Sequence, residues 1–248
     1  MDVIIFGGQS NMQGATESLP VPNNPVEGAW EYRLSIDDLI SLKHPVGENV
    51  RSEQWLAASC EGGGSILPAF CRTYVETCGR KVVAVHAAKG STTIAEWLYG
   101  TQHYFYMRKK ALACIEKLKN MGELARVYYV WLQGESDAVI HTTEQEYFER
   151  LVSFKNRIKL DLGIEKFGII KVGYFSPDGE KYDEAIMGAQ ERAVKQDSDF
   201  VMLSRVCPLL SKDIEYMNTN CLGHYNNKAM EIIGAESGKI LASFTNNL

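Results

Sequence analysis

The sequence lacks long hydrophobic runs, basic clusters and a recognisable leader segment. No apolar stretch approaches the roughly 18 residues that a membrane-spanning helix needs, so we expect no membrane association. The formal net charge is −5 and the basic residues form no run, which disfavours a nucleic-acid partner. The first residues, MDVIIFGG, carry an acid and only a short apolar stretch, unlike a secretory signal. We therefore expect a cytoplasmic protein.

The six cysteines do not have the spacing of a metal or redox site. No pair shows the C-x-x-C spacing of zinc ligands or thioredoxin-like centres. Cys71 and Cys78 lie seven positions apart in an expected helix, where they would share one apolar face and fill the core. We therefore expect reduced cysteines, no bound metal and no cofactor.

The composition is that of an ordinary globular protein. Hydrophobic residues make up 45% of the chain and charged residues 23%, which provides enough apolar material for a sizeable core. Since α/β folds of this length often stay undivided, we expect one domain over residues 1–248. The sequence contains no internal repeat and no low-complexity segment.

Short apolar runs alternate with longer amphipathic segments. The runs are rich in Val, Ile, Tyr and Phe and are bounded by glycine or polar residues, as buried parallel strands are. We expect strands at Asp2–Phe6, Lys81–Ala87, Ala125–Leu132, Phe167–Phe175 and Phe200–Ser204. Helices are expected at Ser65–Cys78, His103–Met121, Thr142–Leu162, Lys181–Gln196 and Tyr225–Phe244. This alternation predicts a three-layer α/β/α sandwich around a mainly five-stranded parallel sheet.

Residues 15–62 are the least regular part of the sequence. They contain four of its prolines, Pro20, Pro22, Pro25 and Pro45. We expect a long loop here, with a short hairpin, packed over one rim of the sheet. Long ordered loops often have a functional role, which makes this segment a candidate wall of a substrate site.

Four polar segments occur where chemistry is expected in such a fold. Three follow expected strands and contain Ser10, the pair Lys89-Gly90, and the segment Gln133–Glu135; the fourth contains His224 and precedes the last helix. Ligands bind beyond the carboxyl ends of parallel strands, so we expect these segments to meet. Together they supply a nucleophile, amide donors, a carboxylate and an imidazole, which are the components of acyl transfer.

Each segment also has an ordinary structural explanation when it is considered alone. Ser10 suits a helix N-cap, and Lys89-Gly90 suits a plain turn. Glu135 suits a solvated loop, and a lone histidine such as His224 is often a surface or core residue. The catalytic interpretation therefore depends on the four segments occurring together.

The segments GGQSNMQG, KGSTTIAEW, WLQGESD and GHYNNKAMEIIG resemble, in this order, sequence blocks of the SGNH hydrolase superfamily. The resemblance is to its acetylesterases, the group of acetylxylan esterases and sialate O-acetylesterases, and it extends over residues 5–234. It implies a flavodoxin-like α/β fold and a serine esterase that removes O-acetyl groups from carbohydrates.

The resemblance also implies roles for particular residues. Ser10 would be the nucleophile and His224 the base. The backbone NH groups of Ser10 and Gly90, with the side chain of Gln133, would form the oxyanion hole. The residues expected to contact the acetylated carbohydrate are Gln9, Lys89 and Trp97.

Two positions depart from the family pattern. Lys89 replaces a glycine, and its cation would suit a carboxylated sugar such as a sialic acid, although a solvated lysine is the simpler explanation. Cys221 replaces the acid three residues before the histidine, and a neutral thiol is a poor acceptor. We therefore expect Glu135 to be the triad acid, with Asp137 as the alternative. His86 is the alternative base.

Two other functions remain open at this point. The same Ser–His apparatus serves esterases that act on lipid acyl chains or thioesters, and the missing acid at Cys221 fits a carbohydrate-binding relative that has lost activity. Aromatic residues could stack on sugar rings or fill the core. The candidates are Trp30, Trp55, Trp97, Tyr99 and Tyr104.

Overall fold

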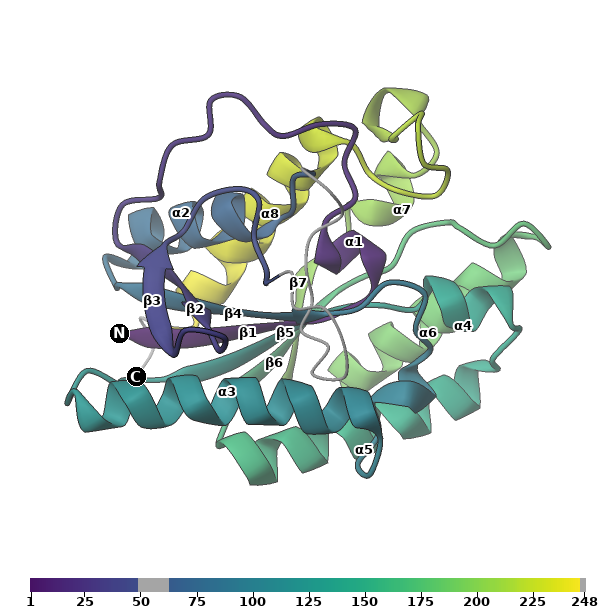
Figure 1. Cartoon of the computed structure of the whole chain (residues 1–248). Coiled ribbons are helices and arrows are strands. Elements are labelled where there is room, and N and C mark those ends of the chain that lie inside the picture. The colour runs from purple at the N-terminus through teal and green to yellow at the C-terminus, as the bar shows by residue number, and fades with distance from the viewer. Residues whose placement is uncertain (49–62, 246–248) are drawn as a thin grey trace.

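A seven-stranded sheet in the order β3-β2-β4-β1-β5-β6-β7 forms the centre of the protein (Figure 1). The structure is a computed structural model that describes residues 1–48 and 63–245. Five strands run parallel, namely β1 (Asp2–Gly8), β4 (Val82–Ala88), β5 (Val127–Leu132), β6 (Lys166–Ile170) and β7 (Phe200–Ser204). Their order, 4-1-5-6-7, is the flavodoxin-like arrangement. The expected parallel core is therefore confirmed.

Two further strands extend the sheet beyond the expected five. The predicted hairpin is present as β2 (Ala29–Arg33) and β3 (Asp38–Ser41), which pair in antiparallel fashion. However, β2 also pairs in parallel with β4, so the hairpin belongs to the sheet and is not a loop over its rim. The edge strand β3 is short, and its end residues are exposed, which explains why its sequence gives no strand signal.

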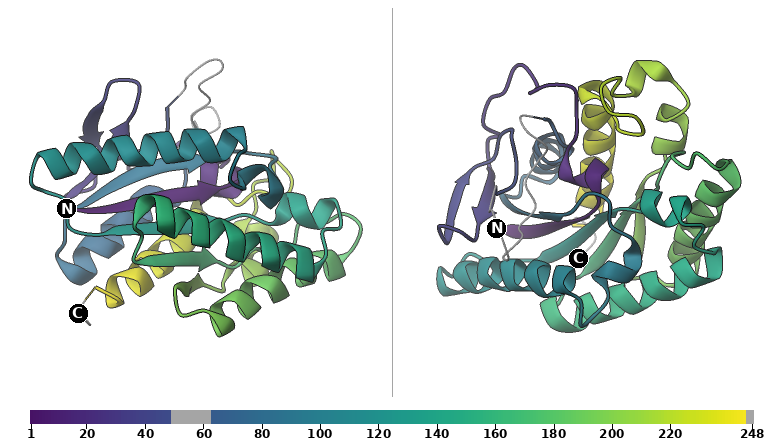
Figure 2. Two further views of the ribbon diagram at one scale, coloured as in Figure 1. Left: turned by 90° about the horizontal axis from the view of Figure 1, so that it is seen from below. Right: turned by 45° about the vertical axis from the view of Figure 1, so that its right-hand side comes forward.

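Helices cover both faces of the sheet, as the sequence predicts (Figures 1 and 2). One face packs against α2 (Leu67–Cys78) and α8 (Asn227–Ser243), and the other against α3 (Gln102–Asn120), α5 (Glu144–Leu162) and α6 (Glu180–Gln196). Successive residues of β1 alternate between the two layers, because side chains along a strand point to opposite faces. Ile4 and Phe6 belong to the α2/α8 core, while Val3 and Ile5 belong to the other.

Short elements lie between the main ones. They are α1 (Ser10–Gln13), η1 (Ile94–Trp97), α4 (Glu135–Val139), α7 (Cys207–Leu210) and η2 (Ile214–Tyr216). Strand β6 ends at Ile170, five residues before the expected end. The backbone NH of Phe175 donates to the Asp183 side chain (3.0 Å) instead of to another strand. A side chain of α6 therefore takes over the hydrogen bonding where the strand pattern in the sequence continues.

The described cysteines, which are Cys71, Cys78, Cys114, Cys207 and Cys221, all carry free thiols. Cys60 lies outside the described residues. Burial raises the pKa of the Cys71 thiol, and Cys71 fills the core beneath α2 as expected. In the part of the chain that the structure describes, no helix is long and apolar enough to cross a membrane.

Helix α8 packs very closely on α2 at two glycines. A Cβ atom at Gly238 would lie 2.2 Å from the Phe70 carbonyl oxygen, and one at Gly234 would lie 2.6 Å from that of Ile66. Only glycine permits this approach of the two backbones. Because α8 begins three residues after His224, this packing also fixes the loop that carries the histidine.

We predict that Gly238→Ala lowers the free energy of unfolding by about 1–3 kcal/mol, because the added methyl group forces two helices apart. Urea unfolding measures the change. Lys239→Ala, at an exposed neighbouring position, is the control and should change stability by less than about 0.5 kcal/mol. Equal unfolding midpoints for Gly238→Ala and wild type would contradict the close packing.

Candidate active site

Ser10 stands at the carboxyl end of β1, where two glycines allow the chain to turn. A Cβ atom at Gly7 would lie 1.9 Å from the Tyr129 hydroxyl oxygen, and one at Gly8 would lie 2.0 Å from the Leu132 carbonyl oxygen. Gly8 also has a φ of 142°, which L side chains rarely adopt. The strand can therefore pass close to β5 and present a half-buried Ser10 at the first position of α1.

The loop after β4 brings Gly90 beside Ser10. A Cβ atom at Gly90 would lie 3.5 Å from the Cβ atom of Ser10. The Gly90 backbone NH donates to Gln13 Oε1 (2.6 Å). The expected pair of backbone donors is thus brought together, and an oxyanion that used the Gly90 NH would replace the Gln13 side chain.

The imidazole of His224 is held in one tautomer by its own loop. Its Nδ1 lies 2.9 Å from the Leu222 carbonyl oxygen and 3.2 Å from Cys221 Sγ. A carbonyl oxygen can only accept, so the bond to Leu222 requires a proton on Nδ1. Nε2 then keeps its lone pair, which is the state that a general base needs.

Asn11, which the sequence reasoning did not select, links α1 to the loop that carries His224. Its side chain is 1% exposed. Nδ2 donates to Glu135 Oε1 (2.8 Å) and to the Gly223 carbonyl oxygen (3.3 Å). Oδ1 accepts from the Tyr225 backbone NH (3.2 Å). The signal available in the sequence was its position directly after the candidate nucleophile.

The structure does not bring Glu135 into hydrogen-bond contact with His224, in contrast to the expected triad. Glu135 opens α4 and is 2% exposed, and its Oε1 accepts from Asn11. Its Oε2 is buried and has no hydrogen-bond partner among the described residues. Burial raises the pKa of the carboxyl, the Asn11 bond opposes this, and the nearby Asp183 and Asp137 raise it further. Glu135 therefore lies beneath the histidine loop, and Leu222 and Cys221 occupy the surroundings of Nδ1.

Gln133 belongs to a buried polar network below the site. Its Nε2 donates to the Gln9 side chain (3.2 Å), the Thr92 carbonyl (2.9 Å) and Asp137 Oδ2 (2.6 Å). Its Oε1 accepts from the Tyr147 hydroxyl (2.9 Å). The two amide hydrogens already face three acceptors, so Gln133 ties neighbouring loops together in this arrangement. A role at the oxyanion stays a prediction.

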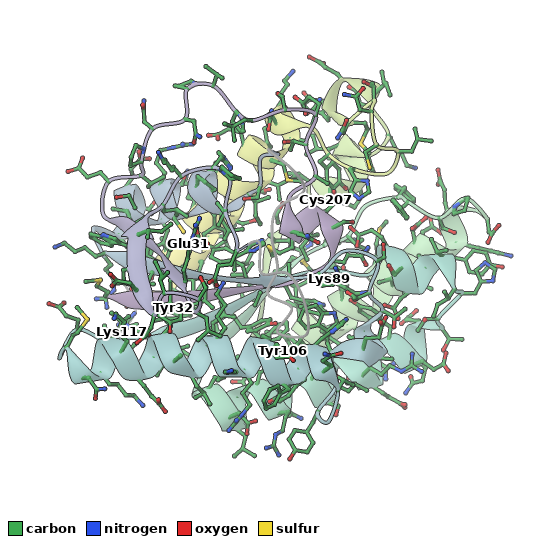
Figure 3. The ribbon with its side chains drawn as sticks, viewed as in Figure 1. Glu31, Tyr32, Lys89, Tyr106, Lys117 and Cys207 are labelled. Carbon is green, nitrogen blue, oxygen red and sulfur yellow. The ribbon has the colours of Figure 1, made fainter. Side chains whose placement is uncertain are left out.

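Of the expected substrate contacts, only Lys89 is partly exposed. Gln9 is 2% exposed and its Oε1 accepts from the Ser136 backbone NH (3.1 Å). Trp97 is 1% exposed and donates from Nε1 to Thr92 Oγ1 (2.9 Å). Both residues therefore support the site from inside, because core packing covers the surfaces that a sugar would touch. Lys89 lies below α1 at the rim (Figure 3).

Two of the aromatic candidates for sugar stacking, Trp97 and Tyr104, are core residues. Tyr104 is 2% exposed and Trp30 is half-buried. Tyr99 is 65% exposed, and the Arg157 guanidinium lies 3.9 Å from its ring centroid. Trp55 lies outside the described residues.

The alternative base and acid are both buried framework residues. His86 is fully buried on β4, with Nε2 3.3 Å from the Met12 carbonyl oxygen. Asp137 accepts from the Ile94 backbone NH (2.7 Å) and the Thr142 hydroxyl (3.0 Å). No group of His, Cys, Asp and Glu within the described residues is arranged to hold a metal ion.

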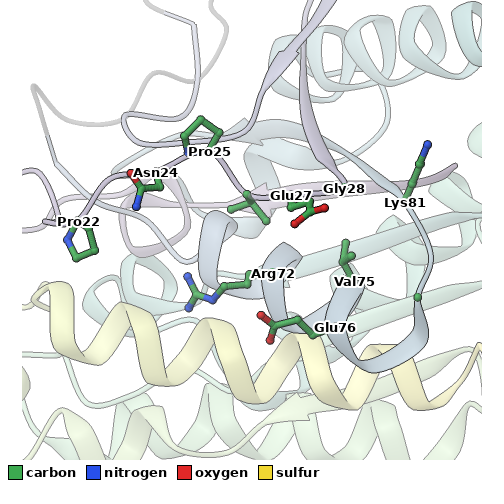
Figure 4. Close-up of a pocket in the computed structure, with 11 residues that line it drawn as sticks. Pro22, Asn24, Pro25, Glu27, Gly28, Arg72, Val75, Glu76 and Lys81 are labelled. Atoms are coloured by element: carbon green, nitrogen blue, oxygen red, sulfur yellow. The ribbon is translucent and has the colours of Figure 1, made fainter.

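A cavity of about 550 Å³ lies away from these residues, beside the amino-terminal end of β4 (Figure 4). It is lined by Pro22, Asn24, Pro25, Val26, Glu27, Gly28, Arg72, Val75, Glu76, Gly79 and Lys81. It contains neither a serine nor a histidine. The chemistry-bearing residues therefore gather at the opposite edge of the sheet, as expected for this fold.

A family model for the carbohydrate esterases described as sialic acid-specific acetylesterases matches residues 1–239. The chain belongs to this family. The match covers all four polar segments, so the family resemblance seen in the sequence is confirmed. Comparison with curated proteins gives no match.

Solved structures of similar fold cover nearly the whole chain. A protein from Arabidopsis thaliana superposes with a TM-score of 0.74 at 19% identity, over 99% of this chain and 98% of that one. NanS gives 0.69 at 16% identity, over 99% and 98%. A carbohydrate acetylesterase from Xanthomonas citri gives 0.56 at 15% identity, over 98% of this chain and 56% of its own. At these identities the likeness establishes the SGNH hydrolase fold.

We predict that the stability of wild type relative to Glu135→Gln falls as the pH rises from about 5 to about 8. The pKa of Glu135 is raised by burial, so the folded chain holds this proton more tightly than the unfolded chain. Stability is lost as the pH rises through the folded pKa, and the amide variant does not titrate. Thermal unfolding across this range measures the trend, with exposed Glu116→Gln as control. A difference that stays constant with pH would contradict the burial of an ionisable Glu135.

Proposed function

We propose that this family member is a serine esterase that removes O-acetyl groups from carbohydrates, with Ser10 as nucleophile and His224 as general base. The observation that carries the proposal is the contact of His224 Nδ1 with the Leu222 carbonyl oxygen. The Nδ1 proton of the imidazole is bound by this carbonyl, which leaves Nε2 free to accept a proton. Asn11, the residue directly after Ser10, is hydrogen-bonded to the loop that carries this imidazole.

These positions support the following reaction. His224 Nε2 takes the Ser10 proton as the hydroxyl oxygen attacks the acetyl carbonyl carbon. The backbone NH groups of Ser10 and Gly90 donate to the oxyanion, once the Gln13 side chain has left the Gly90 NH. The imidazolium gives its proton to the departing sugar oxygen. Water then attacks the acetyl-enzyme with His224 as base, which releases acetate and restores Ser10.

The Leu222 carbonyl replaces in part the carboxylate that the family has at the position of Cys221. It fixes the tautomer and, as a dipole, favours the imidazolium that forms during attack. A carboxylate would stabilise that cation more strongly, because its charge is full and not partial. Cys221 Sγ lies 3.2 Å from the same nitrogen and contributes no charge as a neutral thiol.

The family supports an acetylated carbohydrate as substrate, and the Xanthomonas citri relative of similar fold is a carbohydrate acetylesterase. We propose a carboxylated sugar in particular, because Lys89, the partly exposed chain neighbour of Gly90, carries a cation on the loop that would supply one oxyanion donor. An ammonium at a partly exposed position pairs readily with a carboxylate.

We predict that an organophosphonate labels Ser10 and abolishes hydrolysis of p-nitrophenyl acetate and acetylated sugars, and that Ser10→Ala is inactive and unlabelled. The reason is that the proposed reaction passes through a covalent bond to this oxygen. Mass spectrometry locates the label. Labelling of another serine, with Ser10→Ala fully active, would refute the assignment.

A series of p-nitrophenyl esters of increasing chain length belongs to the same experiment. A preference for acetate supports the proposal, whereas activity that rises toward octanoate identifies a lipid or acyl hydrolase with the same site. A wild type that is inert on every ester, but binds acetylated sugars, identifies a carbohydrate-binding relative.

We predict that Cys221→Asp raises kcat by about tenfold, a fraction of the about 10⁴-fold effect that a triad carboxylate has in a related mechanism. The new carboxylate would lie where Sγ now lies, within reach of Nδ1. Cys221→Ser and Cys221→Asn should leave kcat little changed, because neither adds a charge. A gain in Cys221→Asn equal to that in Cys221→Asp would show that charge is not the cause.

A further inference from the structure

Both the NH₂ group and the oxygen of the Asn11 side chain form hydrogen bonds, and each of them bonds to the loop that carries His224. Gly223 and Tyr225, its two backbone partners, are the residues on either side of His224. The remaining Nδ2 hydrogen goes to Glu135. A side chain that holds the backbone immediately before and after one residue fixes the position of that residue's Cα atom, and hence of its side chain.

The rest of the loop is braced by packing and by its own hydrogen bonds. Gly223 has a φ of 75°, and a Cβ atom there would lie 1.7 Å from the Phe175 ring. The His224 carbonyl accepts from the Asn218 backbone NH (2.7 Å). These contacts shape the loop. The hydrogen bonds of Asn11, the residue next to Ser10, join the loop to α1.

Glu135 and the two backbone partners together determine which way the Asn11 amide points. An amide can be turned over without any change in shape, and the two orientations exchange donor for acceptor. With the carboxyl as acceptor, the NH₂ group must face Glu135 and the Gly223 carbonyl, so the oxygen faces the Tyr225 NH. The reversed orientation would set oxygen against oxygen twice and NH₂ against NH, which leaves buried groups unsatisfied.

The surroundings of Glu135 favour a hydrogen-bond acceptor over a charge. No cation of the described residues forms an ion pair with it, and Oε2 has no partner there. An unpaired buried carboxylate is far more costly than a neutral carboxyl whose oxygen accepts a hydrogen bond. To accept the hydrogen bond from Asn11, Glu135 needs only one oxygen lone pair directed at Nδ2.

We propose that Asn11 and Glu135 form a positioning pair for His224, in which Glu135 orients the Asn11 amide and Asn11 holds the backbone on both sides of the base. The inference rests on the proposed function insofar as it concerns turnover. It assigns Glu135 a role that acts through another residue, in place of direct contact with the imidazole.

Asn11→Asp tests the pair, because it keeps the shape and removes the donor. An oxygen then faces Glu135 Oε1 and the Gly223 carbonyl, the loop shifts, and kcat should fall about 10²-fold with KM little changed, as a misplacement of about 1 Å can cause. Adding Glu135→Gln to this variant supplies a donor opposite the new carboxylate and should restore part of kcat. Asn120→Asp, an exposed position on α3, is the matched control.

Substitutions of Glu135 distinguish an acceptor from a triad acid. Glu135→Gln keeps an oxygen for Asn11, whereas Glu135→Met has similar volume and no acceptor. The pair predicts a much smaller loss of kcat for Gln than for Met. Equal losses of at least about 10²-fold in the two variants would overturn the proposal and favour a charged acid at this position.

A measurement that does not need turnover separates this inference from the proposed function. Nitrogen-15 spectra of the histidine rings, assigned with His224→Ala, report which nitrogen of His224 carries the proton. Wild type should show the Nδ1–H form, and Asn11→Asp should show a mixture, even if the chain hydrolyses no ester. An unchanged His224 signal together with an unchanged kcat in Asn11→Asp would overturn the positioning pair, whereas failure of Ser10 labelling bears only on the proposed function.

Discussion

The hydrogen bonds of Asn11 are the interaction on which the candidate site depends. Tyr225 lies 214 positions beyond Asn11 in the chain, and no local preference of the backbone could hold two such distant segments in register. A fully buried amide makes these bonds specific as well as strong, since each one that is left unmade costs about 1–3 kcal/mol. Asn11 therefore holds the loop of His224 in a fixed position relative to the segment that contains Ser10.

Below that link, a second polar layer holds the loops that follow the parallel strands. Gln133 joins the side chain of Gln9, the loop at Thr92 and the carboxylate of Asp137. All of these atoms are buried, and a buried network of this kind is rigid only when every member has a partner. Gln133 and Asp137, which resemble catalytic groups in the sequence, thus form a buried polar layer beneath the site.

Most contacts in this buried polar layer are between neutral groups. Burial raises the pKa of Glu135, Asp137 and Asp183, and their described hydrogen-bond partners are amides, backbone NH groups and a hydroxyl. The Leu222 carbonyl next to His224 is likewise a neutral hydrogen-bond partner. In the reaction that we propose, orientation by neutral groups would replace much of what a buried charge does in a complete triad.

The sequence alone determined the parallel core and the order of the four polar segments. Apolar runs bounded by glycine predicted five strands and their layers, because burial on both faces leaves a direct mark on composition. The hairpin that extends the sheet escaped this reasoning as a sheet element, because an exposed edge strand has no such mark. The family motifs likewise identified Ser10 and Gly90, which the structure brings side by side.

Only the tertiary structure decided what each of the other side chains does. A position at the end of a strand says that a residue is near the site, but not whether its side chain points up to a substrate or down into the core. Trp97, Gln9 and Gln133 point into the framework, and Glu135 faces Asn11 in place of His224. The partner of a buried polar group is chosen by segments that meet only on folding, and for that reason it could not be read from its neighbours in the chain.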